Sequence, residues 1–189
     1  MAAQVGERLT AAAFEAWADL PENRERTFEF IGGEVVEVPS NPLVSKIAGW
    51  ILTALNMYLL NNDLGHVTGA DGGYIVDGER YVPDVAFISY ARQPELPASG
   101  YNPNPPELAV EVISDPDSGQ EQRNLRLKVS HYLAAGTVVW VVNPADRTVE
   151  VHVPGRAARL VDAAGTLDGG DILPGFALPV KHIFRAGPA

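Results

Sequence analysis

The chain has 189 residues with 24 acidic and 14 basic side chains, so its formal net charge is −10, and it contains no cysteine. The length suits one domain, and 46% hydrophobic with 20% charged residues is the composition of an ordinary globular protein. Without cysteine, disulfides, thiolate zinc sites and cysteine nucleophiles are excluded. The first residues do not resemble a signal peptide and no apolar run reaches about 18 residues, so we expect a cytoplasmic protein with no membrane span.

The negative charge is concentrated in the first three-fifths of the chain. Up to Glu111 there are 16 acidic and 6 basic residues, whereas after it there are 8 of each. A basic surface is the usual mark of a nucleic-acid-binding protein, and this composition does not provide one. Any surface that handles phosphate must therefore be local, or a metal ion must neutralise part of the acidity.

The N-terminal part of the chain is predicted to form two helices separated by a hairpin. Thr10 is the expected N-cap of a helix that ends near Ala18. Residues 27–38 alternate as two strands around Gly32-Gly33, which predicts a two-residue turn. Ser40-Asn41-Pro42 then begins a helix that runs to about Leu60. Its inward positions, at helical spacing, are Val44, Ile47, Ile51, Leu55 and Tyr58.

Strands are expected to dominate the middle of the chain. Short β-rich runs occupy residues 66–70, 73–76 and 82–89, and Asp77-Gly78 predicts a hairpin turn between the last two. Residues 90–106 contain five prolines, which predicts a loop.

The C-terminal part is expected to alternate between strand and helix. Residues 107–114 read as a strand, and Ser118 with Glu121 forms a capping box for a helix that ends at about Ala135 before Gly136. Residues 137–142 are an almost wholly apolar strand, residues 148–153 pair with it, and short strands follow over 154–184. The sequence therefore predicts one mixed α/β domain over 1–189, with a core at 28–153.

Two carboxylates lie in strands where an apolar side chain is expected. Glu111 shares its strand face with Ala109 and Ile113, and Asp84 shares its face with residues such as Ile88. Carboxylates in apolar surroundings on neighbouring strands repel each other unless a cation or a proton lies between them. Oxygen ligands without cysteine suit Mg²⁺ or Mn²⁺. Buried salt bridges, or a solvated sheet edge, would produce the same pattern.

One lysine of the 118–135 helix borders the stripe that is expected to face the sheet. Lys128 is three residues after Leu125 and four before Tyr132, so its stem can follow the core while its ammonium points towards the sheet. A surface lysine with a partly covered stem is the alternative. Arg123 and Arg126 occupy more exposed positions, where they would contact phosphates or only keep the helix soluble.

The sequence argues against several other chemistries. The four histidines, His66, His131, His152 and His182, show no metal-ligand spacing. Gly69 to Gly73 is glycine-rich but no helix is expected after it, so we interpret it as turns. There is no nucleophile elbow and no phosphate-binding glycine loop, and we expect no nucleotide cofactor.

Several segments occur in an order that matches a known arrangement. They are the hairpin at 28–38, Pro83-Asp84 at the start of 83–88, Glu111-Val112-Ile113-Ser114 at the end of 106–114, Lys128 with Tyr132 and Gly136, and residues 139–144 and 173–176. Together they resemble the PD-(D/E)XK nuclease superfamily and, more narrowly, the Uma-two family of restriction-endonuclease-like proteins. The resemblance covers residues 28–184 and rests on the order and spacing of the motifs.

This resemblance implies a restriction-endonuclease-like core, in which helices flank a central mixed sheet, with an N-terminal hairpin and a C-terminal β extension. Asp84 and Glu111 would hold Mg²⁺ or Mn²⁺ with the backbone carbonyl of Val112, and Glu34 would be an additional ligand. The superfamily usually has a lysine two residues after the glutamate, and here that position is Ile113. The Uma-two pattern moves the lysine to the next helix, which makes Lys128 the catalytic candidate, either as the base or as a stabiliser of transition-state charge.

The resemblance also has two smaller departures, since Asn124 and Asn143 stand where relatives often have aspartate. The leading hypothesis is a metal-dependent endonuclease that hydrolyses DNA phosphodiesters through Asp84, Glu111 and Lys128. The alternatives are a catalytically inactive binding or assembly module with a nuclease fold, and a hydrolase of small phosphodiesters. DNA and a second copy of the chain, in a homodimer or higher homo-oligomer, are the expected partners.

Overall fold

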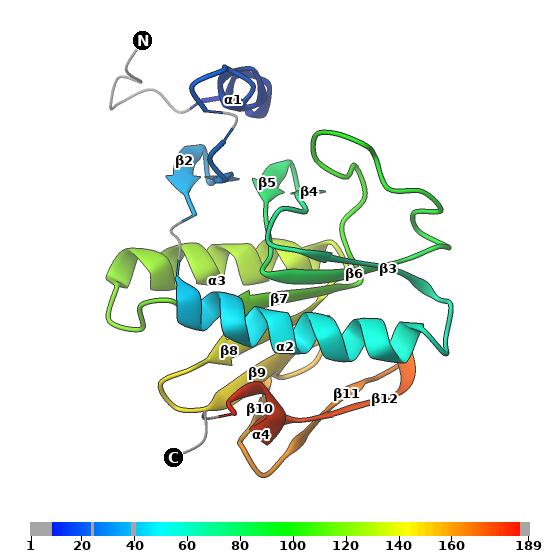
Figure 1. Cartoon of the computed structure of the whole chain (residues 1–189). Helices are drawn as coiled ribbons and strands as arrows, with labels where there is room; N and C mark the ends of the chain where they lie inside the picture. The colour runs from blue at the N-terminus through cyan, green and yellow to red at the C-terminus, as the bar shows by residue number, and fades with distance from the viewer. Residues whose placement is uncertain (1–8, 24, 39–40, 186–189) are drawn as a thin grey trace.

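The computed structural model describes residues 9–23, 25–38 and 41–185, which form helices and strands in three β-sheets (Figure 1). The helices are α1 (Ala11–Ala18), α2 (Pro42–Leu59), α3 (Gly119–Ala134) and α4 (Val180–Ile183). The strands of the first half are β1 (Phe28–Ile31), β2 (Glu34–Glu37), β3 (Gly65–Gly69), β4 (Tyr74–Val76), β5 (Glu79–Tyr81) and β6 (Val85–Ser89). Those of the second half are β7 (Leu108–Val112), β8 (Val138–Asn143), β9 (Thr148–His152), β10 (Arg159–Val161), β11 (Thr166–Gly169) and β12 (Leu173–Pro179).

The central sheet is mixed, as expected. Its six strands have the order β10-β9-β8-β7-β6-β3, in which only β7 and β8 pair in parallel. A parallel pair needs a crossover connection, and α3 provides it. Ser118 accepts a hydrogen bond from the Glu121 N–H at the start of α3, and Gly136 ends the helix with φ +80°.

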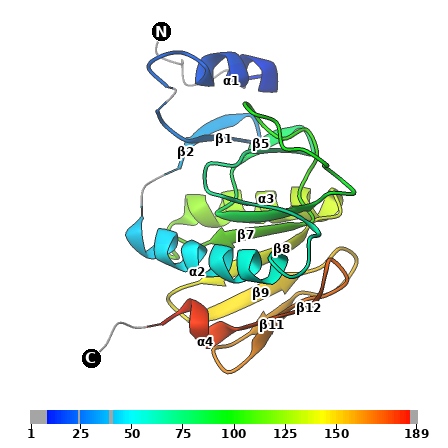
Figure 2. The same ribbon diagram turned by 45° about the vertical axis from the view of Figure 1, so that its right-hand side comes forward.

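Helix α2 covers the front face of this sheet in Figure 1, and α3 covers the face behind it. One face packs against α2, β12 and α4 around a large apolar core. The other packs against α3 and the sheet β2-β1-β5-β4, which the N-terminal hairpin helps to form. Figure 2 shows the β11–β12 hairpin and α4 stacked below β8 and β9, which places the expected C-terminal β extension on the α2 side.

Most of the helix boundaries agree with the sequence expectations. The Thr10 side chain accepts from the Ala13 N–H at the start of α1, and Asn41 Oδ1 accepts from the N–H groups of Leu43 and Val44 at the start of α2. Ser40, the other part of the expected helix start, lies outside the described residues. The Gly32-Gly33 turn is confirmed, with both glycines at positive φ.

The predicted strand over residues 82–89 was wrong in its first part. Asp77-Gly78 joins β4 to β5, and β5 belongs to the N-terminal sheet, whereas β6 belongs to the central sheet. The change of sheet occurs at Val82-Pro83-Asp84, because proline has no N–H to donate and restricts the residue before it. Asp84 therefore lies just before β6, at the junction of the two sheets.

Within these described ranges, no helix is both long and apolar enough to cross a membrane.

Candidate metal and catalytic site

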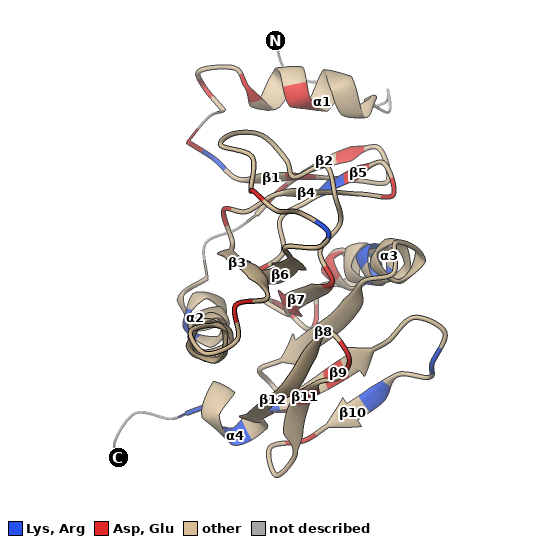
Figure 3. Ribbon diagram, turned by 90° about the vertical axis from the view of Figure 1, so that its right-hand side faces the viewer, with Lys and Arg blue, Asp and Glu red and all other residues tan. Residues whose placement is uncertain are grey.

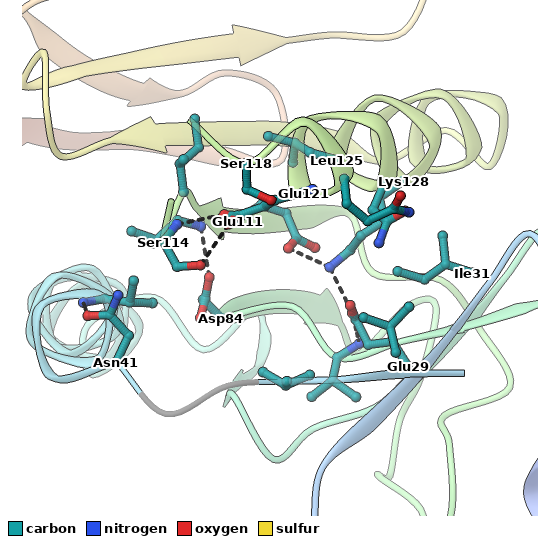
Figure 4. Close-up of a pocket in the computed structure, with 18 of the residues that line it drawn as sticks. Glu29, Ile31, Asn41, Asp84, Glu111, Ser114, Ser118, Glu121, Leu125 and Lys128 are labelled. Carbon is teal, nitrogen blue, oxygen red and sulfur yellow. Dashed lines mark hydrogen bonds and ion pairs between the residues drawn. The ribbon is translucent and has the colours of Figure 1, made fainter. Parts of the chain in front are cut away.

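A cavity of about 270 Å³ lies where the central sheet, the N-terminal hairpin and the first turns of α2 and α3 meet (Figure 4). Its acidic lining residues are Glu29, Glu37, Asp84, Glu111 and Glu121. Among the described residues that line the cavity, Lys128 is the single basic one, and the remaining wall is mainly aliphatic. This cavity brings together the three residues that the sequence singled out for catalysis.

Glu111 reaches the cavity because of the alternation along β7. Leu108 and Val110 face the apolar core beneath α2, so Glu111 points to the opposite face, below α3, where it is only 7% exposed. The Tyr132 hydroxyl donates to Glu111 Oε1 at 3.1 Å, and Lys128 Nζ donates to Oε2 at 2.6 Å. Both donors come from α3, so the helix fixes the orientation of the carboxylate.

Lys128 is a buried residue, and its ammonium lies between two carboxylates. Its Nζ is 2.6 Å from Glu111 Oε2 and 2.7 Å from Glu29 Oε1 (Figure 4). The ring of Tyr81 is 5.6 Å from the same nitrogen, which adds a cation–π contact. The alternative of a surface lysine is therefore wrong, since Lys128 is 6% exposed.

Glu29 is the member of this cluster that the sequence analysis missed. It lies on β1, is 6% exposed, and also accepts a hydrogen bond from the Val82 N–H at 2.8 Å. The signal was present in the sequence, because Glu29 alternates with Phe28 and Phe30 and shares its strand face with the apolar Ile31. The same reasoning that identified Glu111 would have found it.

Asp84 approaches the cavity from the junction before β6. Its Oδ2 accepts a hydrogen bond from the Val112 N–H at 2.7 Å, which ties it to the end of β7. Within the described part of the chain, Oδ1 has no hydrogen-bond partner. This oxygen is available to a ligand in the cavity.

Glu121 has a different role from the one that the capping box predicts. Ser118 caps α3 as expected, but the Glu121 carboxylate does not return to Ser118. It accepts instead from the N–H groups of Ser114 and Asp115, at 2.7 and 2.9 Å, and from the Ser114 hydroxyl at 2.9 Å. Glu121 thereby holds the loop after β7 against α3, at the edge of the cavity.

The charges in the cluster do not balance. Glu29, Asp84 and Glu111 face one ammonium, so two negative charges remain when all four groups are ionised. Burial raises the pKa of Glu111, and Lys128 opposes this rise only in part because the charges of Glu29 and Asp84 add to it. Burial also raises the pKa of Asp84, against the opposing effects of the Val112 N–H and Lys128. A further cation in the cavity would neutralise the excess negative charge and favour the ionised form of both carboxylates.

The lysine responds in the opposite direction. Burial alone would lower the pKa of Lys128, but Glu111 and Glu29 more than reverse this effect, so its pKa is raised. Lys128 therefore stays protonated at neutral pH. An ammonium in this position can stabilise negative charge but cannot accept a proton.

The other predicted site residues lie outside the cavity. Glu34 is exposed on β2, and the structure does not place it in the cavity wall. Arg123 and Arg126 are exposed on α3, where Arg123 donates to Gln120 Oε1 at 2.6 Å. Gln120, which accepts from Arg123, and Asn124 of the same helix do line the cavity, whereas neither arginine does.

The donor chemistry of the cavity fits a divalent cation such as Mg²⁺. Across residues 9–23, 25–38 and 41–185, no three His, Asp or Glu side chains are arranged to hold a metal by themselves. Mg²⁺ is commonly held by one or two carboxylates together with water and substrate oxygens. Asp84 and Glu111, which line the cavity together with Val112, would be those carboxylates.

The model of the Uma2 (Uma-two) family, described as "Putative restriction endonuclease", matches residues 11–181. A solved structure from Anabaena variabilis ATCC 29413, described as a "putative nuclease belonging to DUF820", superposes with a TM-score of 0.77 at 21% sequence identity and covers 93% of this chain and 97% of its own. No curated protein sequence matches the chain. The structural likeness confirms the expected fold class.

Proposed function

Because the chain belongs to the Uma2 family of restriction-endonuclease-like proteins, we propose that it is a metal-dependent endonuclease that hydrolyses phosphodiester bonds of DNA. The observation that carries this proposal is the cavity in which Glu29, Asp84 and Glu111 face the single ammonium of Lys128. Such an excess of buried negative charge is costly to a fold unless a cation neutralises it. A metal ion held by Asp84 and Glu111 would supply this cation.

Asp84 and Glu111 would hold Mg²⁺ or Mn²⁺, with the backbone carbonyl of Val112 as a third ligand and water in the remaining positions. The ion, when bound, would activate a water molecule and neutralise charge that develops on the phosphate. Asp84 keeps its orientation through the Val112 N–H, and Glu111 keeps its orientation through Tyr132 and Lys128. The protein thus orients both carboxylates before the metal arrives.

Lys128 would act as a stabiliser of negative charge on the scissile phosphate. Its raised pKa keeps the ammonium protonated, and a protonated donor fixed in a water-poor cavity stabilises a developing oxyanion without reorganisation. Glu29 and Glu111 hold it from two different sheets. In this role Glu29 is a positioning residue, because it acts through Lys128.

Arg123 and Arg126 would contact the phosphates on either side of the cut. Both are exposed on α3, and Gln120 and Asn124 connect their surface to the cavity wall. Arginine presents several donors to phosphate, so two arginines on one helix offer a local basic surface on an otherwise acidic protein. Glu34 remains a weaker candidate for an additional metal ligand.

Plasmid nicking and calorimetric titration of Mn²⁺ test the proposal together. The wild type should bind roughly one or two ions per chain and cleave DNA only with metal. Asp84→Asn and Glu111→Gln keep the hydrogen-bonding shape and should lose metal binding, while Lys128→Met should bind metal but cleave on the order of 100-fold more slowly. Glu22→Gln, a change of the same kind in the exposed turn after α1, is the matched control. Metal-dependent cleavage that survives in Asp84→Asn would refute the site.

A hydrolase of small phosphodiesters is the second candidate, and the size of the cavity favours it. A volume of about 270 Å³ with an acidic wall suits a compact substrate better than an extended polyanion. Hydrolysis of bis(p-nitrophenyl) phosphate without plasmid cleavage would identify this activity. If the protein binds no metal and cleaves neither substrate, the inactive binding module is the correct interpretation.

A further inference from the structure

The outward face of α2 lacks the charges that a solvent-facing helix normally carries. Its 18 residues include one charged residue, Lys46, and neither aspartate nor glutamate, although the whole chain has a net charge of −10. In Figure 3, α2 is almost entirely tan, whereas α3 on the other side of the sheet is strongly coloured. Because charged side chains normally occupy the exposed side of a helix, it is the exposed side of α2 that lacks them.

Large apolar residues form a stripe along this exposed side. Leu43, Trp50 and Met57 follow one another at intervals of seven residues, with exposures of 53%, 39% and 64%, and Leu60 is 84% exposed. A seven-residue repeat on one face is the pattern by which a helix packs against a second helix. The inward positions, such as Ile51 and Leu55, are separately buried in the core.

Gly49 adds an independent observation on the same face. Glycine in a helix interior is destabilising relative to alanine, so it needs a reason. The described part of the chain provides none, since a Cβ built on Gly49 would meet no atom within 4 Å beyond its chain neighbours and the backbone of its own helix. The Thr53 hydroxyl lies one turn further along and donates to the Gly49 carbonyl at 2.7 Å. A small residue with open space above it allows a second helix to approach closely.

The two ends of the stripe carry opposite charges. Lys46 and Arg185 lie at the Leu43 end, where Lys46 Nζ donates to the Arg185 carbonyl. The guanidinium of Arg185 lies 5.3 Å from the centre of the Trp50 ring. Asp63 follows the Leu60 end. An isolated helix is favoured by the reverse placement, with acids near its N-terminus and bases near its C-terminus. An antiparallel partner would bring the basic end of each helix against the acidic end of the other.

We propose that the exposed face of α2 is the contact between two copies of this chain, which pack their α2 helices antiparallel about a two-fold axis near Gly49 and Thr53. The stripe is self-complementary, because Leu43 of one copy then meets Leu60 of the other, and two-fold contacts require such reciprocity. Because α2 has no carboxylate, two strongly acidic chains can meet there without repulsion. This proposal is independent of the proposed catalytic activity.

The size of the face indicates a dimer of moderate strength. A helix of 18 residues is about 27 Å long, and a stable interface needs about 800 Å² from each partner. The helix alone supplies only part of this area. Leu64 follows the C-terminal end of α2, and Tyr90, which comes after β6, donates its N–H to the Leu64 carbonyl at 3.0 Å; both are 37% exposed and add apolar surface at this end of the helix. We therefore expect a dimer that dissociates on dilution.

Sedimentation velocity over a wide range of protein concentrations tests the proposal. The wild type should move from the mass of one chain to that of two, and Met57→Lys should raise the dissociation constant about 100-fold or more, because it places an ammonium against Lys46 of the other copy. Leu160→Lys, on β10, is the matched control, since Leu160 is exposed to the same 64%. It should leave the dissociation constant unchanged.

Gly49→Ala separates association from folding. In the single chain it should raise the melting temperature, because helical glycine is replaced without a clash, yet it should weaken the dimer by widening the helix crossing. A wild type that stays monomeric at the highest concentration, or a dimer that Met57→Lys leaves intact, would overturn the proposal.

Discussion

The two faces of β7 show how one strand serves both stability and chemistry. Leu108, Val110 and Val112 enter a continuous apolar core beneath α2, β12 and α4. On the opposite face, Glu111 lies in a smaller core beneath α3, together with Lys128 and the buried tyrosines Tyr81 and Tyr132. The first face contains the larger apolar cluster, so we infer that it supplies most of the stability. The second face can therefore hold charged groups in a low-dielectric environment without unfolding the chain.

The largest expected effect is on the apolar face. Trp140, on β8, is 1% exposed and packs with its ring 6.1 Å from that of Phe176. Trp140→Ala should lower the free energy of unfolding by about 3–5 kcal/mol, since it leaves a cavity that the sheet cannot close. Urea unfolding followed by circular dichroism measures this loss. Below the transition, Mn²⁺ binding should be retained, and a variant that folds normally but binds no metal would contradict the separation of the two faces.

On the charged face, the loss of stability after a substitution should depend on whether unpaired carboxylates remain buried. Lys128→Met should cost about 3 kcal/mol, because Glu29 and Glu111 lose the cation between them. Adding Glu29→Gln and Glu111→Gln to this variant removes the unpaired charges and should restore part of the stability. Urea unfolding of the single and triple variants gives the comparison. A triple variant less stable than Lys128→Met would mean that the cost arises from packing around the lysine stem.

The periodicity of the sequence was sufficient for the elements that carry most of the site. Residues 107–114, 118–135 and 137–142 correspond to β7, α3 and β8, because their apolar spacing, capping serine and final glycine are local signals. The alternation in β7 placed Glu111 correctly opposite Leu108 and Val110. The position of Lys128 at the edge of the inward stripe was likewise readable from helical spacing.

The parts that were missed depend on contacts between distant segments. β5 was not predicted, because the hairpin after Asp77-Gly78 was continued with residues 82–89 and nothing local to residues 79–81 shows that they pair with β1, far away in the sequence. The role of Glu29 depends on Lys128, which is 99 positions away. Glu121 was assigned to Ser118 by a local rule, although Ser114 and Asp115 offered it more donors. Local pattern thus predicts elements and faces, whereas the partners of buried charges require the fold.

The smallest expected effect is a change in the pH dependence of stability. In the folded, metal-free chain, burial raises the pKa of Glu111 above its ordinary value of 4.5. At a pH between the ordinary pKa and the raised pKa, the folded state holds a proton that the unfolded state has released. The free energy of unfolding should therefore fall as pH rises through this window. In Glu111→Gln this contribution is absent, and the decline should be shallower.

Urea midpoints from about pH 5 to about pH 8 in the presence of EDTA test this difference. Saturating Mn²⁺ should reverse the sign in the wild type, because the metal binds the ionised carboxylate and therefore stabilises the fold more strongly as pH rises. The variant should show a much weaker response. Parallel profiles for the two proteins would mean that Glu111 is fully neutralised by Lys128, and the charged face would then be a closed ion pair with no capacity for a metal.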